Sequence, residues 1–355
     1  MVIVVPGVEH VYAWLPRGPW AIHVLAIDHR ICAPDLLVAH AGPPLTAAAG
    51  VSAIARDALA AMNADFFALP AGTPVGAQVS DDEIAIGPGR RPVFALADGG
   101  YWAGAASIRG VARHGMDSTD IAQVNRPREG DAGHPAVTGL TLFTHWWGRP
   151  TTVDSAAVIL GVRVIDGGAS TGRGVVAAKT RTGTVALGVG RVALQAAVGT
   201  RAGDWLNRRT VGDTIRWNSA LVPASSTTLQ FAARQAVGGF PVLLQNAHLV
   251  TDAGEPVAPT FGPVRHPRSA VGWNRATQQQ YWVVVDGRQR PYSDGMTLAE
   301  VAALYQRLGA TDAINLDGGG STTLLIRNRI VNRTSDATGE RAVGNALLLQ
   351  SCPRT

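Results

Sequence analysis

Short apolar runs separated by turn residues recur along the whole chain. Their length of about five to eight residues is typical of buried β-strands. Gly (41 residues) and Pro (21 residues) are plentiful and often separate these runs, which favours a fold with many turns. The pattern therefore predicts a β-rich protein. The clearest predicted strands are 21–28, 93–97, 157–165 and 281–285.

Helical patterns are few. Thr297 followed by Glu300 forms a capping box, and Gly309 is placed to stop the helix that it starts. Two further segments are predicted to be helical: the Ala-rich stretch 46–60, with Thr46 as a possible cap, and the short stretch 201–208.

The C-terminal third predicts a strand–helix–strand crossover. The strands 281–285 and 311–316 flank the capped helix, so we expect them to be parallel neighbours in one sheet. Asp286 and Asp317 each follow such a strand and should emerge at the same sheet edge, where open α/β sheets bind ligands. Asn63 and Asp65 also follow a predicted helix and strand, so they could join this edge.

The sequence predicts an α/β (α+β) class. We expect one domain over 1–355, with a mixed sheet, N-terminal strands in 1–44 and a mostly β subregion in 150–235. No linker or fixed repeat divides the chain. Segment 105–135 has little periodicity and several arginines, so we expect a long loop that crosses the surface.

Composition and charge limit the classes of function that fit this sequence. The chain of 355 residues is 46% apolar, so it can bury a core, and its net charge is +5. Lys179 is the only lysine, so the basic charge is nearly all arginine, which suits phosphate and carboxylate recognition. The arginines are scattered, and no basic run predicts nucleic-acid binding. No apolar run approaches membrane-spanning length.

Two cysteines bear on the compartment. Cys32 and Cys352 lie near opposite ends of the chain and could form one disulfide or remain two buried thiols. A disulfide would imply an oxidising compartment. A secreted or cell-envelope location is expected, with a cytoplasmic one left open.

The stretch 315–323, Asn-Leu-Asp-Gly-Gly-Gly-Ser-Thr-Thr, carries the strongest chemical signal. Three glycines between apolar runs indicate an unusual turn or a close approach of backbone to a ligand. Successive free N–H groups there would form a nest for an anion, and Asp317 would lie at its mouth. The alternative is a β-hairpin with a glycine bulge.

Carboxylates and arginines together suit a substrate that carries a sugar and a phosphate. Paired carboxylates serve acid–base work or water activation at an anomeric carbon. Arginine forks hold phosphate. In the alternative interpretation the arginines are surface charges and Asp286 is a turn cap. The candidate set is Asp65, Asp286 and Asp317 with Arg265, Arg268, Arg288, Asn63 and Asn315.

The chain resembles the phosphodiester glycosidase family from about residue 45 to residue 349. The specific motifs are Arg-His-Pro-Arg-Ser-Ala-Val-Gly at 265–272 and the stretch from Asn315; further matches lie at 63–67, 238–243, 284–288 and 344–347. Ser269 stands where relatives usually have threonine, and Asn246-Ala247 where they often have Asp-Gly. By motif, the resemblance implies a site containing Asn63, Asp65, Gly239, Arg265, Arg268, Asp286, Asp317, Gly318, Gly319, Ser321, Asn332, Ser335 and Asp336.

The resemblance implies a hydrolase that releases a sugar, N-acetylglucosamine or another hexose, from a sugar-1-phosphodiester. Asp317, Asp286 and Asp65 are the expected catalytic residues and the others bind substrate. No cofactor is expected, although Ca²⁺ or Mg²⁺ on oxygen ligands stays open. Two alternatives remain: a non-catalytic binding protein for phosphorylated envelope glycan, and a metal-dependent phosphodiesterase. The sequence leaves the sugar, the stereochemistry and the oligomeric state open.

Overall fold

The computed structural model describes residues 1–127, 139–151, 156–226, 228–252 and 254–355. Strands make up 49% of the protein and helices 8%. The prediction of a β-rich fold is confirmed, whereas the single domain over 1–355 stays a prediction. No described helix is both long and apolar enough to span a membrane.

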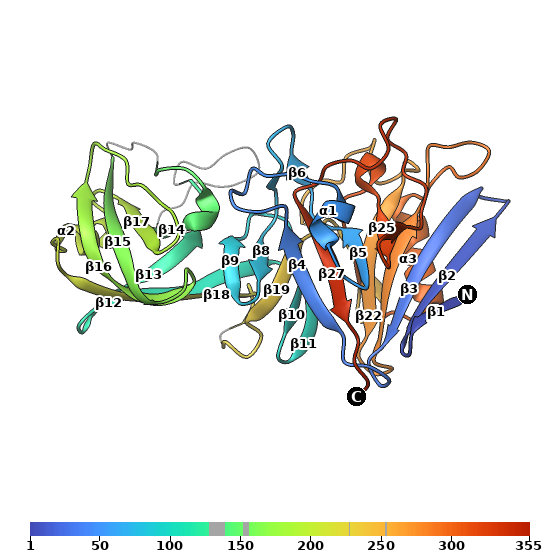
Figure 1. The fold of residues 1–355 in the computed structure, drawn as a ribbon, viewed down its shortest axis with the longest axis horizontal. Helices are drawn as coiled ribbons and strands as arrows, with labels where there is room; N and C mark the ends of the chain where they lie inside the picture. Colours follow the sequence, from blue (N-terminus) through green and yellow to red (C-terminus); the bar gives the residue numbers. More distant parts are fainter. Residues whose placement is uncertain (128–138, 152–155, 227, 253) are drawn as a thin grey trace.

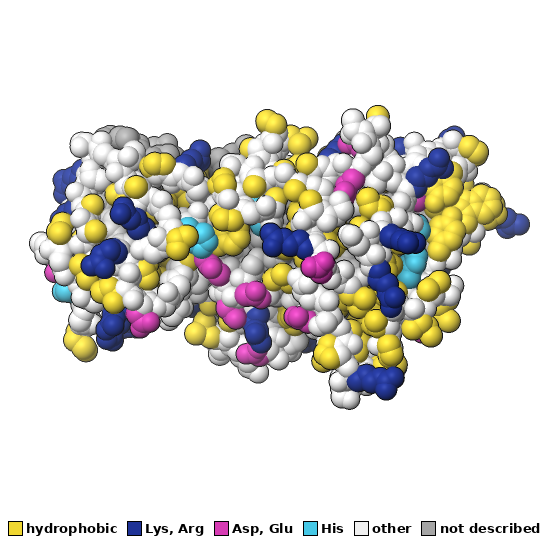
Figure 2. Space-filling model, in the orientation of Figure 1, with side chains coloured by type: hydrophobic (Ala, Val, Ile, Leu, Met, Phe, Trp, Pro, Cys, Tyr) yellow, Lys and Arg dark blue, Asp and Glu magenta, His cyan; other side chains and the backbone are white. Residues whose placement is uncertain are grey.

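The largest sheet has eight strands and carries the predicted C-terminal strands. Its order is β1 (Val2–Val5), β2 (Val8–Leu15), β3 (Trp20–Asp28), β23 (Gln279–Val285), β22 (Arg268–Asn274), β24 (Asp312–Asn315), β20 (Val242–Gln245) and β21 (His248–Leu249). On its outer edge, β1 and β2 expose hydrophobic side chains, visible as the yellow patch at the right of Figure 2.

A five-stranded sheet packs face to face against the eight-stranded one. Its order is β26 (Arg329–Ile330), β25 (Leu324–Ile326), β5 (Ala60–Asn63), β27 (Asn345–Ser351) and β4 (Asp35–His40). Buried side chains of both sheets, such as Trp282 and Leu347, form one core. Helix α3 (Leu298–Arg307) packs against buried residues on the other face of the eight-stranded sheet, and α1 (Val51–Ala55) does the same for the five-stranded one.

A third sheet and a barrel extend the molecule away from the two termini (Figure 1). The third sheet consists of β11 (Gly100–Gly104), β10 (Val93–Ala97), β19 (Ala233–Gly238), β8 (Gln78–Ser80) and β9 (Glu83–Ile86). The closed barrel consists of β12 (Ala106–His114), β13 (Asp117–Val124), β14 (Leu140–Phe143), β17 (Arg191–Ala197), β15 (Ala157–Gly167), β16 (Thr171–Thr180) and β18 (Thr214–Pro223). Smaller elements are the pair β6 (Phe67–Ala68) and β7 (Thr73–Pro74), α2 (Arg201–Asn207) and the 3₁₀ turn η1 (His145–Trp147).

The barrel confirms strands in 150–235 and corrects the predicted surface loop. Segment 106–124 is not a loop but the barrel hairpin β12–β13. Few residues of β12 are buried, so the alternation that marks a half-buried strand is weak there. The part of the predicted loop in 128–135 lies outside the described residues.

Two helix predictions are confirmed and one is shortened. Thr297 Oγ1 accepts a hydrogen bond from the Glu300 N–H, and the Glu300 carboxylate accepts one from the Thr297 N–H, which completes the capping box of α3. Helix α2 forms as expected. The predicted helix 46–60 is limited to α1, which follows Gly50 rather than Thr46. An isolated Ala-rich run of this length is marginal without packing.

The crossover forms, but its two strands are not neighbours. β23 and β24 are both antiparallel to β22, so they run parallel to each other with β22 between them. The prediction of adjacent strands is therefore wrong: the motif at 265–272 also contributes a strand, which lies between them. Asp286 and Asp317 nevertheless both follow the carboxyl ends of parallel strands, as predicted.

A disulfide links the two end regions of the chain. Cys32, which follows β3, forms a disulfide with Cys352, which follows β27, across 320 residues of sequence. The structure thereby settles the cysteine pairing that the sequence left open. The bond links the segments leading into and out of the five-stranded sheet.

Candidate active site

The stretch 315–323 connects the two packed sheets. It leaves β24 in the eight-stranded sheet and enters β25 in the five-stranded one. A hairpin joins two paired strands, so the alternative of a glycine hairpin is wrong. The connection passes the end of β5: the Asp317 N–H donates to Ala64 O at 2.8 Å, and Asn63 Nδ2 donates to Asp317 O at 2.7 Å. Asn63 and Asp65 therefore meet Asp317 as predicted, although from another sheet.

Asn63 fixes this junction through its side-chain oxygen. Asn63 Oδ1 accepts hydrogen bonds from Ser269 Oγ at 2.7 Å and from the Thr323 N–H at 3.1 Å. With its amide nitrogen on Asp317 O, the side chain is bonded to both ends of the connection and to β22. We therefore assign Asn63 a positioning role: it holds the backbone that presents Asp317.

The three glycines allow close packing rather than an open nest. The N–H groups of Gly318 and Gly319 bond to Asp317 Oδ1 and Pro267 O, both at 2.9 Å. A Cβ on Gly318 would lie 2.6 Å from Pro267 O, and one on Gly320 would overlap the Arg341 guanidinium. Gly319 adopts φ +62°, which favours glycine. The expected nest of free N–H groups is thus not formed by residues 318 and 319.

Asp65 is a buried carboxyl with little to stabilise its charge. Its Oδ2 accepts one hydrogen bond, from the Gly76 N–H at 2.7 Å, and its buried Oδ1 has no partner among the described residues. Burial raises the pKa of Asp65 to about 7, against the opposing Gly76 bond and the charges of Arg91 and Arg126. Any side chain on Gly238 would collide with this carboxyl.

Asp317 is the second carboxyl of the site. Desolvation raises the pKa of Asp317 to about 6, while Ser321, the Gly318 N–H and the Arg341 and Arg91 charges oppose the rise. Its charge also raises the pKa of Asp65, so the two groups are coupled. Asp317 keeps partial solvent exposure, whereas Asp65 is only 1% exposed. The pair thus combines a fully buried residue with one that is partly accessible to solvent.

Arg268 and Arg288 are cations beside the glycine turn without an acidic partner among the described residues. Arg268 is buried, and its Nε and Nη2 donate to the carbonyls of Met296, Phe261 and Val264. Burial and the nearby Arg288 charge lower the pKa of Arg268 to about 10, so it stays charged at neutral pH. The Arg288 guanidinium lies 3.2 Å from the position of a Cβ on Gly319. Two adjacent, unneutralised guanidinium groups favour an anion.

Arg91 and Arg341 belong to the site and were missed. Each lowers the pKa of Asp317 by its charge. Arg91 also lies over the rings of Phe66 and Phe240, at 4.7 and 5.2 Å from their centroids. Neither residue belongs to one of the motifs, although Arg91 directly follows Arg90, so no local signal pointed to the site.

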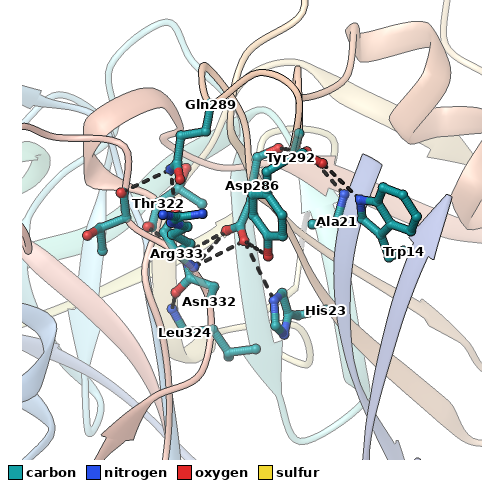
Figure 3. Close-up of polar contacts among 12 residues, drawn as sticks. Trp14, Ala21, His23, Asp286, Gln289, Tyr292, Thr322, Leu324, Asn332 and Arg333 are labelled. Atoms are coloured by element: carbon teal, nitrogen blue, oxygen red, sulfur yellow. Dashed lines mark hydrogen bonds and ion pairs between the residues drawn. The ribbon is translucent and has the colours of Figure 1, made fainter. Parts of the chain in front are cut away.

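The fully buried Asp286 side chain lies at the centre of a separate network (Figure 3). Its carboxylate accepts hydrogen bonds from Tyr292 Oη at 2.9 Å, Asn332 Nδ2 at 3.1 Å and the Arg333 N–H at 3.0 Å. His23 Nε2 lies 3.8 Å away. A carboxylate enclosed by this many donors orients the loop around Asn332, and it has no exposed oxygen to offer a substrate.

Three other predicted residues, Asn332, Asn315 and Gly239, hold neighbouring segments of the site in place. Asn332 bridges Asp286 to Thr322 O, at 3.1 Å each. Asn315 Nδ2 donates to Phe240 O at 2.7 Å, and a Cβ on Gly239 would lie 2.7 Å from Asn315 O. These contacts hold β24 against the segment that follows β19.

Of the remaining predicted residues, some lie at the glycine turn and one does not. Ser321 is buried in the 3₁₀ turn η2 (Gly319–Ser321). Ser335 Oγ donates to Gly319 O at 3.3 Å, and Asp336 accepts from Arg341 Nε at 2.7 Å, so both lie beside the glycine turn. Arg265 is not brought to Asp317: it pairs with Glu300 at 2.6 Å and donates to Gly18 O.

No group of three or more His, Cys, Asp and Glu side chains that could hold a metal ion occurs among the described residues. The donor set that the structure brings together is two carboxyls with raised pKa values and a rim of arginines. Such a set can move a proton and bind an anion in one small space.

Comparisons with known proteins point to one family. The sequence profile of the phosphodiester glycosidase family matches residues 174–350. The SPbeta prophage-derived protein YomE of Bacillus subtilis (strain 168) is 36% identical over 86 residues, which is 24% of this chain and 13% of that protein.

Solved structures share the fold over nearly the whole chain. A Synechocystis protein matches with a TM-score of 0.72 and 24% identity, over 96% of this chain and 61% of its own. A protein of Burkholderia pseudomallei K96243 matches with a TM-score of 0.70 and 27% identity, over 96% and 76%. The catalytic domain of zebrafish N-acetylglucosamine-1-phosphodiester alpha-N-acetylglucosaminidase, auto-inhibited by its pro-peptide, matches with a TM-score of 0.52 and 15% identity, over 98% and 84%. At 15% and 24% identity, the zebrafish and Synechocystis likenesses are evidence of fold alone.

Proposed function

We infer that this protein is a glycoside hydrolase acting on a sugar-1-phosphodiester, because residues 174–350 match the sequence profile of the phosphodiester glycosidase family. The observation that supports the proposal is the coupled pair Asp65 and Asp317, whose pKa values are raised by burial, with Arg288 beside the same glycine turn. N-acetylglucosamine or another hexose is the proposed sugar. The aglycone is left open.

We propose that Asp317 acts on the water that attacks the anomeric carbon. With a pKa of about 6 it is mostly ionised at neutral pH, yet basic enough to accept a proton. The water oxygen bonds to C1, the C1–O bond to phosphate breaks, and the water proton passes to the Asp317 carboxylate. The products are a free sugar and a phosphomonoester. Asp317 suits this role because it keeps solvent exposure.

Asp65 acts on Asp317 through their coupling rather than on the substrate. It is buried behind the exposed carboxyl and shares the charge of the pair, so near neutral pH the two groups together retain part of one proton. A second carboxylate would otherwise repel the anionic substrate. We propose that Asp65 tunes the basicity of Asp317.

The arginines are proposed to stabilise the negative charge of the phosphate leaving group. A phosphodiester is already an anion and scarcely needs protonation to leave, but the charge that develops as C1–O breaks must be held. We propose that Arg288 holds it, while the charge of the buried Arg268 and the charges of Arg341 and Arg91 near Asp317 stabilise it at longer range. Asp286 and Asn332 are proposed to position the turn, and Arg265 to stabilise the helix α3.

The test is a hydrolysis screen with UDP-N-acetylglucosamine and simple hexose-1-phosphodiesters. We expect release of free sugar by the wild type and a loss of at least a hundredfold with Asp317→Asn, which keeps the size of the side chain. The exposed Asp57→Asn is the matched control and should retain activity. Equal activity of Asp317→Asn and wild type would overturn the proposal.

Two alternatives predict other results in the same screen. A metal-dependent phosphodiesterase would lose activity with a chelator, whereas the proposed reaction continues. A non-catalytic glycan-binding protein would release no sugar from any phosphodiester yet would bind it. A secreted or cell-envelope location is also proposed, and the Cys32–Cys352 disulfide supports it because such bonds persist in oxidising compartments.

A further inference from the structure

The barrel carries a groove of about 500 Å³ on its outer wall. Its lining comes from strands β12, β16 and β18 and from the end of β15. The Asp317 site lies among β5, β24 and β25, in the sheets at the other end of the molecule (Figure 1). The groove is therefore separate from the candidate active site.

Three arginines form a row along this groove. Arg113 lies directly opposite Arg216 in the β12–β18 pair, and Arg216 lies directly opposite Arg173 in the β16–β18 pair. Directly opposed residues of antiparallel strands point to the same face. The neighbours Ala112 and Trp217 are buried in the barrel, so the arginine row faces outward. With strands about 4.8 Å apart, the row is about 10 Å long.

The charge of this row is not balanced within the protein. None of the three arginine side chains forms a hydrogen bond or an ion pair with any described residue, and Arg173 Nε is buried without such a partner. Asp166, opposite Arg173, is the one carboxylate in the lining. Like charges placed directly opposite each other destabilise a sheet. A bound anion would remove this repulsion. The barrel end of the face in Figure 2 also displays several Lys and Arg side chains.

A second row in the groove is neutral, with the apolar Val111 opposite Asn218 at one end and polar residues at the other. Thr171 lies opposite Asn218, both are exposed, and neither side chain is hydrogen-bonded to a described residue. Hydroxyl and amide groups can both donate to and accept from sugar hydroxyls. Guanidinium forks bind phosphate oxygens in pairs. The two rows together match a ligand with sugar and phosphate in alternation.

The aromatic residue of the groove argues against nucleic acid. Trp217 is 2% exposed, and its indole N–H donates to Ala169 O at 3.0 Å. Its ring is therefore not available for stacking on bases, which single-strand-binding surfaces use. A sugar phosphate needs no such platform.

We propose that the barrel groove is a second binding site, which holds a phosphate-bearing glycan through Arg113, Arg173 and Arg216. The choice of a glycan rests on the proposed function, whereas the binding of anionic phosphate does not. The groove would hold one part of a chain while another part lies at Asp317. This makes the barrel a substrate-anchoring part of the protein.

The experiment compares two double variants of the full chain that lose the same charge. Arg113→Gln with Arg216→Gln removes the row. Arg109→Gln with Arg181→Gln removes two exposed barrel arginines outside the groove. Binding of phosphomannan, unphosphorylated mannan and single-stranded oligo(dT) is measured by titration calorimetry at 50 mM salt, in an Asp317→Asn background that prevents turnover. Circular dichroism checks that each variant is folded.

We expect phosphomannan binding to weaken at least tenfold in the groove variant and less than twofold in the control, and both mannan and oligo(dT) to bind more weakly than phosphomannan. Equal weakening in both double variants, absence of phosphomannan binding, or oligo(dT) binding as tight as phosphomannan would overturn the proposal. Hydrolysis of a small hexose-1-phosphodiester, measured without the Asp317 change, should be unaffected by the groove variant. Groove binding without any hydrolysis would overturn the proposed function and leave this inference standing.

Discussion

Replacing Asp65 by Asn should make the protein more stable at alkaline pH and less active. Burial raises the pKa of Asp65 from 3.8 to about 7. A carboxyl whose folded pKa is raised favours folding only while it is protonated. Its contribution is complete below the unfolded value near pH 4 and is lost as the pH rises through about 7. Asn never ionises, so the variant does not incur this loss.

The magnitude follows from the shift. Three pKa units at about 1.4 kcal/mol each give an upper limit of about 4 kcal/mol for the difference between pH 4 and pH 8. Asn keeps an oxygen for the Gly76 N–H but turns an amide toward the space where Asp65 Oδ1 has no partner among the described residues. An unpaired buried amide costs about 1–3 kcal/mol at every pH. The variant should therefore be less stable than wild type at pH 4 and more stable at pH 8.

Urea unfolding of both proteins at several pH values between 4 and 8 measures this difference. The packing cost cancels when the difference at pH 4 is subtracted from that at pH 8, and the exposed Asp57→Asn corrects for the general effect of losing a carboxylate. In parallel, the acid limb of kcat/KM should keep the Asp317 pKa of about 6 in the Asp65 variant, whereas any dependence of the rate on pH near 7 should disappear, because Asp65 no longer titrates. A stability difference that does not change with pH would refute the assignment of Asp65 as a buried, destabilised acid.

Three further predictions concern neighbouring residues. Asp286→Asn should destabilise the protein by about 2–4 kcal/mol in urea unfolding, because it places an amide N–H₂ against donors that now bond to a carboxylate. Asp317→Asn should not destabilise the protein in this way. Equal stabilities of the two variants would argue against a structural role of Asp286. Gly320→Ala should displace the flexible Arg341 guanidinium from Asp317 and so move the acid limb of the rate profile to higher pH, with stability changed by less than about 1 kcal/mol; an unmoved limb would contradict the role given to Arg341. Replacing both Cys32 and Cys352 by Ser should cost about 2–5 kcal/mol in the same unfolding assay without changing kcat, and an unchanged midpoint would contradict a stabilising disulfide.

Local signals in the sequence predicted those parts of the fold that depend on neighbouring residues. The capping box at Thr297 and the strand 281–285 form as expected because their determinants lie within a few residues. The hairpin β12–β13 was missed because a strand with few buried residues lacks the alternation that marks it. The position of β22 between β23 and β24 depends on long-range pairing, which periodicity does not encode.

Local sequence likewise predicted some residues of the candidate site and not others. The motif at 315–323 located Asp317, and the segment 63–65 located its partner. The expected partner Asp286 is instead enclosed by Tyr292, Asn332 and the Arg333 N–H, which come together only in the folded chain. The pairing of Arg265 with Glu300 spans 35 residues, so no local pattern marked it as a helix contact.

The glycine turn illustrates what burial adds to a motif. Sequence alone suggested a nest of free N–H groups for phosphate. In the folded chain the N–H groups of residues 318 and 319 bond to protein oxygens, and the positive charge beside the turn comes from the side chains of Arg268 and Arg288. Free hydrogen-bonding groups cannot be counted before the partners are placed.

The position of bond cleavage tests the central claim most directly. A hexose-1-phosphodiester that the wild type hydrolyses is turned over in ¹⁸O-labelled water, and the products are separated and weighed by mass spectrometry. Attack at the anomeric carbon predicts the label on the C1 hydroxyl of the released sugar and none in the phosphomonoester. Label in the phosphate and not in the sugar would contradict a glycosidase mechanism and indicate a phosphodiesterase.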